Sequence, residues 1–157
     1  FSYFMGGINF VDMAYLTDKN ITEGRLIYHR KKTSKLINLP LQEKALMVLK
    51  GYKDNSKGYL FPILSNAHKT EQQKLNRLHK VITKVNKALK AIGEELNIPI
   101  KLTTYCARHS YATVLKRAGV ATSIISESLG HSSERVTQIY LDSFENNQID
   151  KAMEYLK

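Results

Sequence analysis

Chemically capable side chains concentrate in three short stretches of the sequence. They are Arg30-Lys31-Lys32, Ala107-Arg108-His109-Ser110-Tyr111-Ala112-Thr113, and Leu129-Gly130-His131-Ser132, with Tyr140 nine residues after the histidine. A guanidinium can hold two oxygens of an oxyanion and stays charged throughout the neutral range. A phenol, with a pKa near ~10, becomes a useful nucleophile only where nearby cations favour its ionised form. These residue types suit attack on a bound phosphate, provided that the fold brings them together.

Two of these stretches, with the interval that follows them, resemble the tyrosine recombinase, or phage integrase, family. In that family the second catalytic arginine lies in an Arg-His-Ser/Thr-x-Ala-Thr stretch, and a Leu-Gly-His-Ser box precedes the nucleophilic tyrosine by nine residues. Arg108, His131 and Tyr140 match in type, order and spacing, and the resemblance runs through essentially the whole chain. It implies the family's catalytic-domain fold, mainly α-helical with a small antiparallel β-sheet.

The resemblance also implies a reaction, the cleavage and rejoining of DNA without a metal or a cofactor. Tyr140 would form a 3′-phosphotyrosyl bond, Arg108 would clamp the scissile phosphate, and His131 would donate to that phosphate in the transition state. The leaving 5′ oxygen needs a proton. In the family a hairpin lysine shortly before a proline provides it, which indicates Lys32, eight residues before Pro40. Lys31 and Lys35 are close rivals, because a hairpin register is uncertain from sequence alone.

The sequence departs from the family pattern at two positions. Asn9 stands where the family has its first arginine, in Gly7-Ile8-Asn9-Phe10-Val11-Asp12, while Asp12 keeps the acidic position that supports the second arginine. We hypothesise that Arg30 restores the missing charge. Tyr105 replaces a histidine, and since a phenol is a weaker base near pH 7, proton removal from Tyr140 rests on another group or on water. The pattern resembles a variant branch from mobile elements that also lacks the first arginine.

Each candidate has an ordinary structural explanation. An isolated Tyr140 would be read as a core or interface aromatic, an isolated Arg108 as a surface ion-pair residue, and the lysines of the hairpin as a polar turn. The functional interpretation is favoured only because these residues stand together in the motifs described above. His109 is expected to be buried, hydrogen-bonded and outside the reacting set, and Cys106 to be a small core residue.

Composition narrows the partners. The 157 residues carry 24 Lys and Arg against 14 Asp and Glu, a net charge of +10, which favours nucleic acid first and an anionic membrane surface second. One cysteine excludes an internal disulfide, leaves no zinc cluster and fits a reducing cytoplasm. No apolar run approaches the roughly 20 residues of a membrane span.

The candidate residues need elements to position them. Hydrophobic spacing predicts a short helix over 8–16, strands over 25–30 and 35–39 around the turn 31–34, and a helix over 41–50 opened by Pro40. A pinned loop follows, then the clearest amphipathic helix over 75–92, whose other face carries cations that either are solvated or contact DNA. Helices capped by Thr103 or Thr104 and ending near Ala118, over 122–129, and from Ser132 or Ser133 through Tyr140 complete the predicted domain.

The resemblance carries expectations about assembly. Residues 1–157 would form one catalytic domain lacking an upstream DNA-binding domain, and would act on double-stranded DNA as a homo-tetramer in the bacterial cytoplasm, at the nucleoid. A last helix, with Ile149, Met153 and Leu156, would dock from about 147–157 on a neighbouring subunit, after a candidate linker over 142–147. DNA-bending or directionality proteins would be accessory partners. The alternatives are a non-cleaving DNA-binding relative, a topoisomerase-like enzyme and, least favoured, a basic RNA-binding module.

Overall fold

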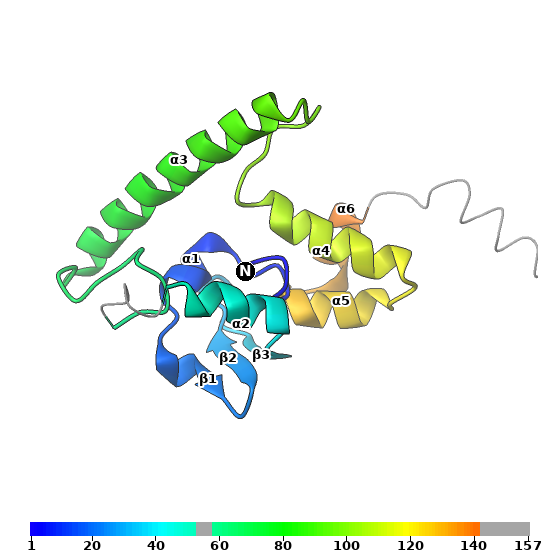
Figure 1. Ribbon diagram of the computed structural model, residues 1–157. Coiled ribbons are helices and arrows are strands. Elements are labelled where there is room, and N and C mark those ends of the chain that lie inside the picture. Colours follow the sequence, from blue (N-terminus) through cyan, green and yellow to red (C-terminus); the bar gives the residue numbers. More distant parts are fainter. Residues whose placement is uncertain (53–57, 142–157) are drawn as a thin grey trace, which may run out of the picture.

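The structure, a computed structural model, describes residues 1–52 and 58–141, without the side chains of Ile139 and Tyr140. It is mainly helical with one small antiparallel sheet, as predicted (Figure 1). The helices are α1 (Phe10–Ala14), α2 (Glu43–Lys50), α3 (Glu71–Glu95), α4 (Cys106–Arg117), α5 (Thr122–Leu129) and α6 (Glu134–Tyr140). A short 3-10 helix, η1 (Asp18–Asn20), leads into the strands β1 (Ile21–Thr22), β2 (Arg25–His29) and β3 (Leu36–Pro40). The predicted linker and last helix lie outside the described residues.

The sheet confirms the predicted hairpin and adds the short strand β1. Its order is β1-β2-β3, with Leu26 paired to Leu39 and Tyr28 to Ile37. Leu26, Tyr28 and Ile37 are buried, so alternate side chains face the core. The turn 30–35 contacts the end of α5, because Arg30 and Thr33 both donate to the carbonyl of Gly130.

Pro40 does not open a helix, so this prediction was wrong. Pro40 is the last residue of β3 and pairs with Arg25, and α2 begins at Glu43 after Gln42. Proline, which has no amide hydrogen, is tolerated in an edge strand such as β3 and equally at the first position of a helix. The sequence alone therefore did not distinguish the two.

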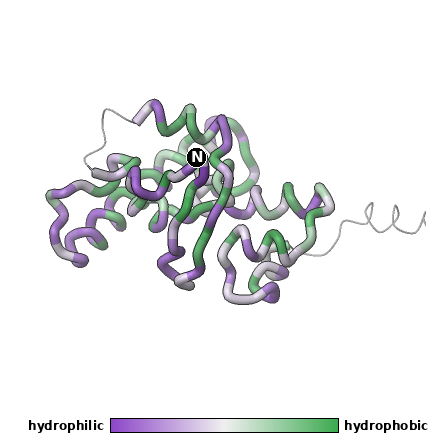
Figure 2. The backbone as a smooth tube through the Cα atoms, turned by 90° about the horizontal axis from the view of Figure 1, so that it is seen from below, coloured by the Kyte–Doolittle hydropathy of each residue, from purple (hydrophilic) through white to green (hydrophobic). Residues whose placement is uncertain are grey.

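Two hydrophobic clusters flank the site. The larger one joins α1, the sheet, α2, the segment after it and Leu78 of α3. The smaller one joins Ala112 of α4, Ile125 and Leu129 of α5, and Leu141. In Figure 1 the helices α4 to α6 form a group beside the sheet and α1, and Figure 2 shows hydrophilic segments alternating with hydrophobic ones along the chain.

Helix α3 extends further than the predicted range, and its apolar stripe is only partly covered. Thr70 caps its start, with Gln73 completing a capping box. Leu78 is buried, whereas Leu75 and Ile92 are 54% and 46% exposed. Among the cations of the other face, Arg77 donates to the Ile63 carbonyl. None of the helices that the structure describes has the length and apolar character to cross a membrane.

The last helices follow the predicted pattern apart from one cap. Helix α5 spans the predicted residues and ends at Leu129, and the Gly130 that follows has a left-handed φ of 64°. Helix α6 begins after Ser133 and ends at Tyr140. Helix α4, however, begins after Tyr105 without a side-chain cap, because the Thr103 hydroxyl accepts from the Tyr105 amide instead of capping the helix.

Candidate active site

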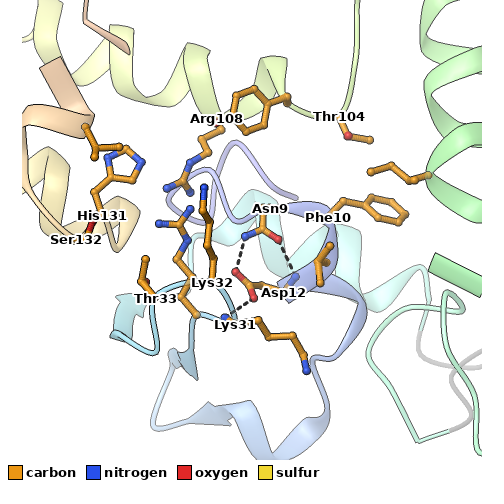
Figure 3. A pocket seen from close by; sticks show the side chains of 15 residues that line it. Asn9, Phe10, Asp12, Lys31, Lys32, Thr33, Thr104, Arg108, His131 and Ser132 are labelled. Carbon is orange, nitrogen blue, oxygen red and sulfur yellow. Dashed lines mark hydrogen bonds between the residues drawn. The ribbon is translucent and has the colours of Figure 1, made fainter. Parts of the chain in front are cut away.

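A cavity of about 520 Å³ lies between α1, the β2–β3 turn, the start of α4 and the junction of α5 with α6. It brings together the predicted site residues whose side chains the structure describes, which are Arg30, Lys32, Tyr105, Arg108 and His131. Figure 3 shows Arg108, His131 and Lys32 converging on it from different elements. Tyr140 ends α6, whose Val136 also lines the cavity, but its side chain is outside the description. The fold therefore brings residues that are far apart in the sequence into a single site.

Arg108 is held at the base of the cavity by backbone carbonyls. It is 2% exposed, and its Nη1 and Nη2 atoms donate to the carbonyls of Gly7 (2.9 Å) and Leu129 (2.5 Å). A Cβ at Gly7 would stand 2.9 Å from the Arg108 Cα, and the φ of 63° is left-handed, so glycine is required there. Burial, and secondly the charge of Arg30, lower the pKa of Arg108 to about 10. Arg108 therefore remains charged at neutral pH.

Arg30 enters the same cavity from the end of β2. It is 7% exposed, and its Nη1 donates to the Gly130 carbonyl at 2.7 Å. Within residues 1–52 and 58–141, neither Arg30 nor Arg108 pairs with a carboxylate, and the buried Nε atom of each makes no hydrogen bond. Two buried guanidiniums without a counter-charge are unfavourable unless an anion joins them. The site therefore has the charge and the donors to bind an oxyanion.

His131 lies beside the two arginines and is tied to α6. It is 2% exposed, and its Nδ1 is 2.8 Å from the hydroxyl of Thr137, which is fully buried. Burial, followed by the charges of Arg108 and Arg30, lowers the pKa of His131 to about 4. The imidazole is thus neutral at pH 7, and a bound anion would raise its pKa.

Asn9 and Asp12 bind each other instead of the arginines. The Asn9 side chain accepts from the Asp12 amide at 2.8 Å, which caps α1, and donates to Asp12 Oδ2 at 2.5 Å. Asp12 is 3% exposed, and its other oxygen accepts from the Lys31 amide at 2.8 Å. The expected direct support of Arg108 by Asp12 is not observed, since Asp12 acts on it only at longer range, by raising its pKa.

The three candidate lysines occupy different positions. Lys31 and Lys32 both line the cavity, but the Lys32 side chain extends toward Arg108, whereas the Lys31 side chain points away from it (Figure 3). The Lys31 ammonium lies 3.6 Å from the centre of the Tyr15 ring. Lys35 does not line the cavity. The geometry therefore favours Lys32.

Tyr105 and His109 form a pair at the rim. Tyr105 is 44% exposed, lines the cavity and contacts His109 edge to face, with ring centroids 4.9 Å apart. His109 is exposed, so its predicted burial was wrong. It follows Arg108 directly on α4, and successive helical residues point about 100° apart, so one faces the cavity and the other turns away. Cys106 is half-buried and accepts from the Thr103 amide rather than filling the core.

Sequence reasoning missed three polar residues of the site. Thr33 lines the cavity and donates to the Gly130 carbonyl at 2.9 Å. Ser132 also lines it. Thr137 had one detectable signal, its position three residues before Tyr140, which puts both on one helix about one turn apart. Thr33 had none beyond its place in a polar turn.

In this helical domain two buried arginines, a histidine and a hairpin lysine surround one cavity, an arrangement suited to binding an oxyanion. Comparison with known sequences makes this specific: residues 10–147 match the phage integrase family, to which the chain belongs. It is 30% identical over 128 residues to tyrosine recombinase XerA of Pyrococcus furiosus, covering 80% of this chain and 41% of that protein. Tyrosine recombinase XerC of Roseiflexus castenholzii is 33% identical over 111 residues, covering 69% and 34%. The chain thus spans less than half the length of these relatives.

Solved structures share the fold. The crystal structure of XerA recombinase matches with a TM-score of 0.69 at 20% identity, covering 98% of this chain and 55% of that one. XerH site-specific recombinase, bound to palindromic difH substrate in a post-cleavage complex, matches with a TM-score of 0.70 at 18% identity, covering 97% and 42%. These matches confirm the predicted catalytic-domain fold.

Proposed function

We propose that this chain is the catalytic domain of a site-specific DNA recombinase that cleaves and rejoins DNA through a 3′-phosphotyrosyl intermediate. The observation that carries the proposal is the convergence of Arg30 and Arg108 on a cavity that Lys32 and His131 also line. Both arginines are buried, and neither has a carboxylate partner among the residues that the structure describes. Such a site would stabilise the negative charge on a phosphodiester in the transition state of transfer between two oxygens. Family membership supports the same conclusion.

In the proposed cleavage step, the Tyr140 oxygen attacks the phosphorus and the bond from phosphorus to the 5′ oxygen breaks. Arg108 and Arg30 hold the non-bridging oxygens, and Arg30 takes the part of the arginine that Asn9 replaces. His131, neutral at pH 7, donates a hydrogen bond to the charge that accumulates. Lys32 gives a proton to the leaving 5′ oxygen. The phenol proton passes to another group or to water, because Tyr105 is a weaker base than imidazole.

Rejoining reverses these steps. A 5′ hydroxyl from a partner strand attacks the phosphotyrosine, the new phosphodiester forms, and Tyr140 leaves with a proton. The energy of the broken bond is conserved in the link between protein and DNA, so the reaction needs no high-energy cofactor. Strand exchange implies four subunits on two DNA sites, with 147–157 docking on a neighbour, an upstream domain on the other face of the DNA, and DNA-bending or directionality proteins. We place this activity in the bacterial cytoplasm, at the nucleoid.

Covalent capture tests the proposal. Nicked duplexes with a randomised core would be incubated with the full-length protein, and covalent complexes would be isolated on a denaturing gel and amplified to give a capture duplex. A covalent band with the wild type that is absent from Tyr140→Phe is expected. If this selection yields no covalent complex with the wild type while the protein still binds the duplexes, the proposal is wrong.

A non-cleaving DNA-binding domain is the second candidate. Its supporting observation is that the Asn9 side chain is engaged with Asp12, so nothing at that position can act as the family's first arginine. Binding without capture would establish it. Relaxation of supercoiled plasmid without strand exchange would instead indicate a topoisomerase-like activity.

A further inference from the structure

The turn between β2 and β3 is held from both sides. On one side Asp12 accepts a hydrogen bond from the Lys31 amide. On the other side the Gly130 carbonyl accepts from the Thr33 hydroxyl at 2.9 Å and from Arg30 at 2.7 Å. Lys32 lies between these two attachments, so its backbone is fixed by groups that belong to α1 and to the end of α5.

The Asp12 attachment depends on Asn9. The Asp12 carboxylate is buried, forms no ion pair among the described residues, and would be costly to bury without donors. The Asn9 amide satisfies one oxygen at 2.5 Å, and this contact turns the other oxygen toward the Lys31 amide. Asn9 also caps α1, which fixes the helix that carries Asp12. Two hydrogen bonds therefore connect Asn9, through Asp12, to the residue before Lys32.

We propose that Asn9 is a positioning residue for Lys32, acting through Asp12 on the Lys31 amide. This inference rests on the proposed role of Lys32 as proton donor to the leaving oxygen. The position where the family has an arginine has thus not simply lost a phosphate contact. It holds the proton-donating hairpin, while Arg30 provides the charge from the hairpin itself.

A sulfur-substituted DNA distinguishes a role in positioning the proton donor from a role in phosphate binding or in folding. When the 5′ bridging oxygen of the scissile phosphate is replaced by sulfur, the leaving group is a thiolate, which needs no proton because a thiol has a pKa near ~8.5. A defect in proton donation then disappears, whereas a defect in phosphate binding or in folding persists. The probe is the capture duplex with oxygen or with sulfur at that bond.

The variants divide the functions of Asn9. Asn9→Ala removes both its contacts, and Asn9→Ser keeps a cap oxygen but loses the amide nitrogen that donates to Asp12 Oδ2. We expect each to slow cleavage of the oxygen duplex by ~10-fold, since misplacement of a proton donor is costly, and to cleave the sulfur duplex within ~3-fold of wild type. Lys32→Ala is the reference variant. It should cleave the oxygen duplex ~100-fold more slowly than wild type and should also recover on the sulfur duplex. Thr70→Ala, which removes the side-chain cap of α3 at a position that does not line the cavity, is the matched control and should be unchanged on both.

The outcomes are distinct. If Lys32→Ala recovers on sulfur but the Asn9 variants remain equally slow on both duplexes, the positioning inference is wrong and Lys32 keeps its role. If Lys32→Ala does not recover either, the proton-donor role fails and the inference fails with it. Recovery of the Asn9 variants in parallel with Lys32→Ala supports both, and normal unfolding of Asn9→Ser excludes a general loss of structure.

Discussion

The imidazole Nδ1 of His131 lies 2.8 Å from the hydroxyl oxygen of Thr137, one residue of the helix that ends at Tyr140. Both side chains are buried, at 2% and 0% exposure. The contact therefore joins the cavity that Arg30 and Arg108 line to the helix of the proposed nucleophile. It also fixes the orientation of the imidazole ring through one of its two nitrogens.

Replacing Thr137 should affect both stability and cleavage. Thr137→Val keeps the shape but leaves the buried Nδ1 without its partner, which costs about 1–3 kcal/mol of unfolding free energy. Cleavage of the capture duplex should fall by ~10-fold, because the orientation of His131 relaxes. Thr137→Ser, which retains the hydroxyl, should keep more activity than Thr137→Val. Equal rates for both variants in a single-turnover capture assay would contradict a positioning contact.

Inorganic sulfate should stabilise the protein through the two arginines. An anion that binds only the folded state raises the melting temperature, and neither Arg30 nor Arg108 forms an ion pair with a carboxylate among the described residues. We expect a larger rise in sulfate than in chloride of equal ionic strength, and its loss in Arg30→Met. Arg25→Met, at the other end of β2, is the control and should keep the rise. A sulfate effect that survives in Arg30→Met would place the anion elsewhere.

The pH dependence of stability should carry a signature of His131. Its pKa is about 4 in the folded protein and near 6.5 when unfolded, so between these values the unfolded state binds the extra proton. Stability is therefore fully present above pH 6.5 and is lost as the pH falls toward 4, by about 3 kcal/mol. Urea unfolding of His131→Gln should show a flatter profile than the wild type across this window. His79→Gln, an exposed histidine on α3, should leave the profile unchanged.

Restoring the arginine of the family should reduce activity. Asn9→Arg removes the cap of α1 and the amide donor to Asp12, and it adds a third guanidinium to a cavity that already holds two. The new side chain would compete with the Lys31 amide for the Asp12 carboxylate. We expect capture of the oxygen duplex to slow by ~10-fold. Faster capture than wild type would mean that Asn9 marks only a lost phosphate contact.

The local pattern of the sequence already determines much of this protein. Helix α5 with its terminal glycine, helix α6 ending at Tyr140, and the β2–β3 hairpin follow from spacing and turn residues, because these act over one helical turn or one strand pair. The motifs around Arg108 and His131 likewise predicted the family without any coordinates.

Tertiary structure decided which of the candidate side chains share the cavity. Arg30 contacts the carbonyl of Gly130, Lys32 rather than Lys31 faces Arg108, and Asp12 accepts a hydrogen bond from the Lys31 amide. Pro40 suited a strand end as well as a helix start, and only the pairing of β3 with β2 resolved it. The physical reason is common to these cases: burial, direction and charge at these residues depend on elements about 20 to 100 positions away, which no local pattern records.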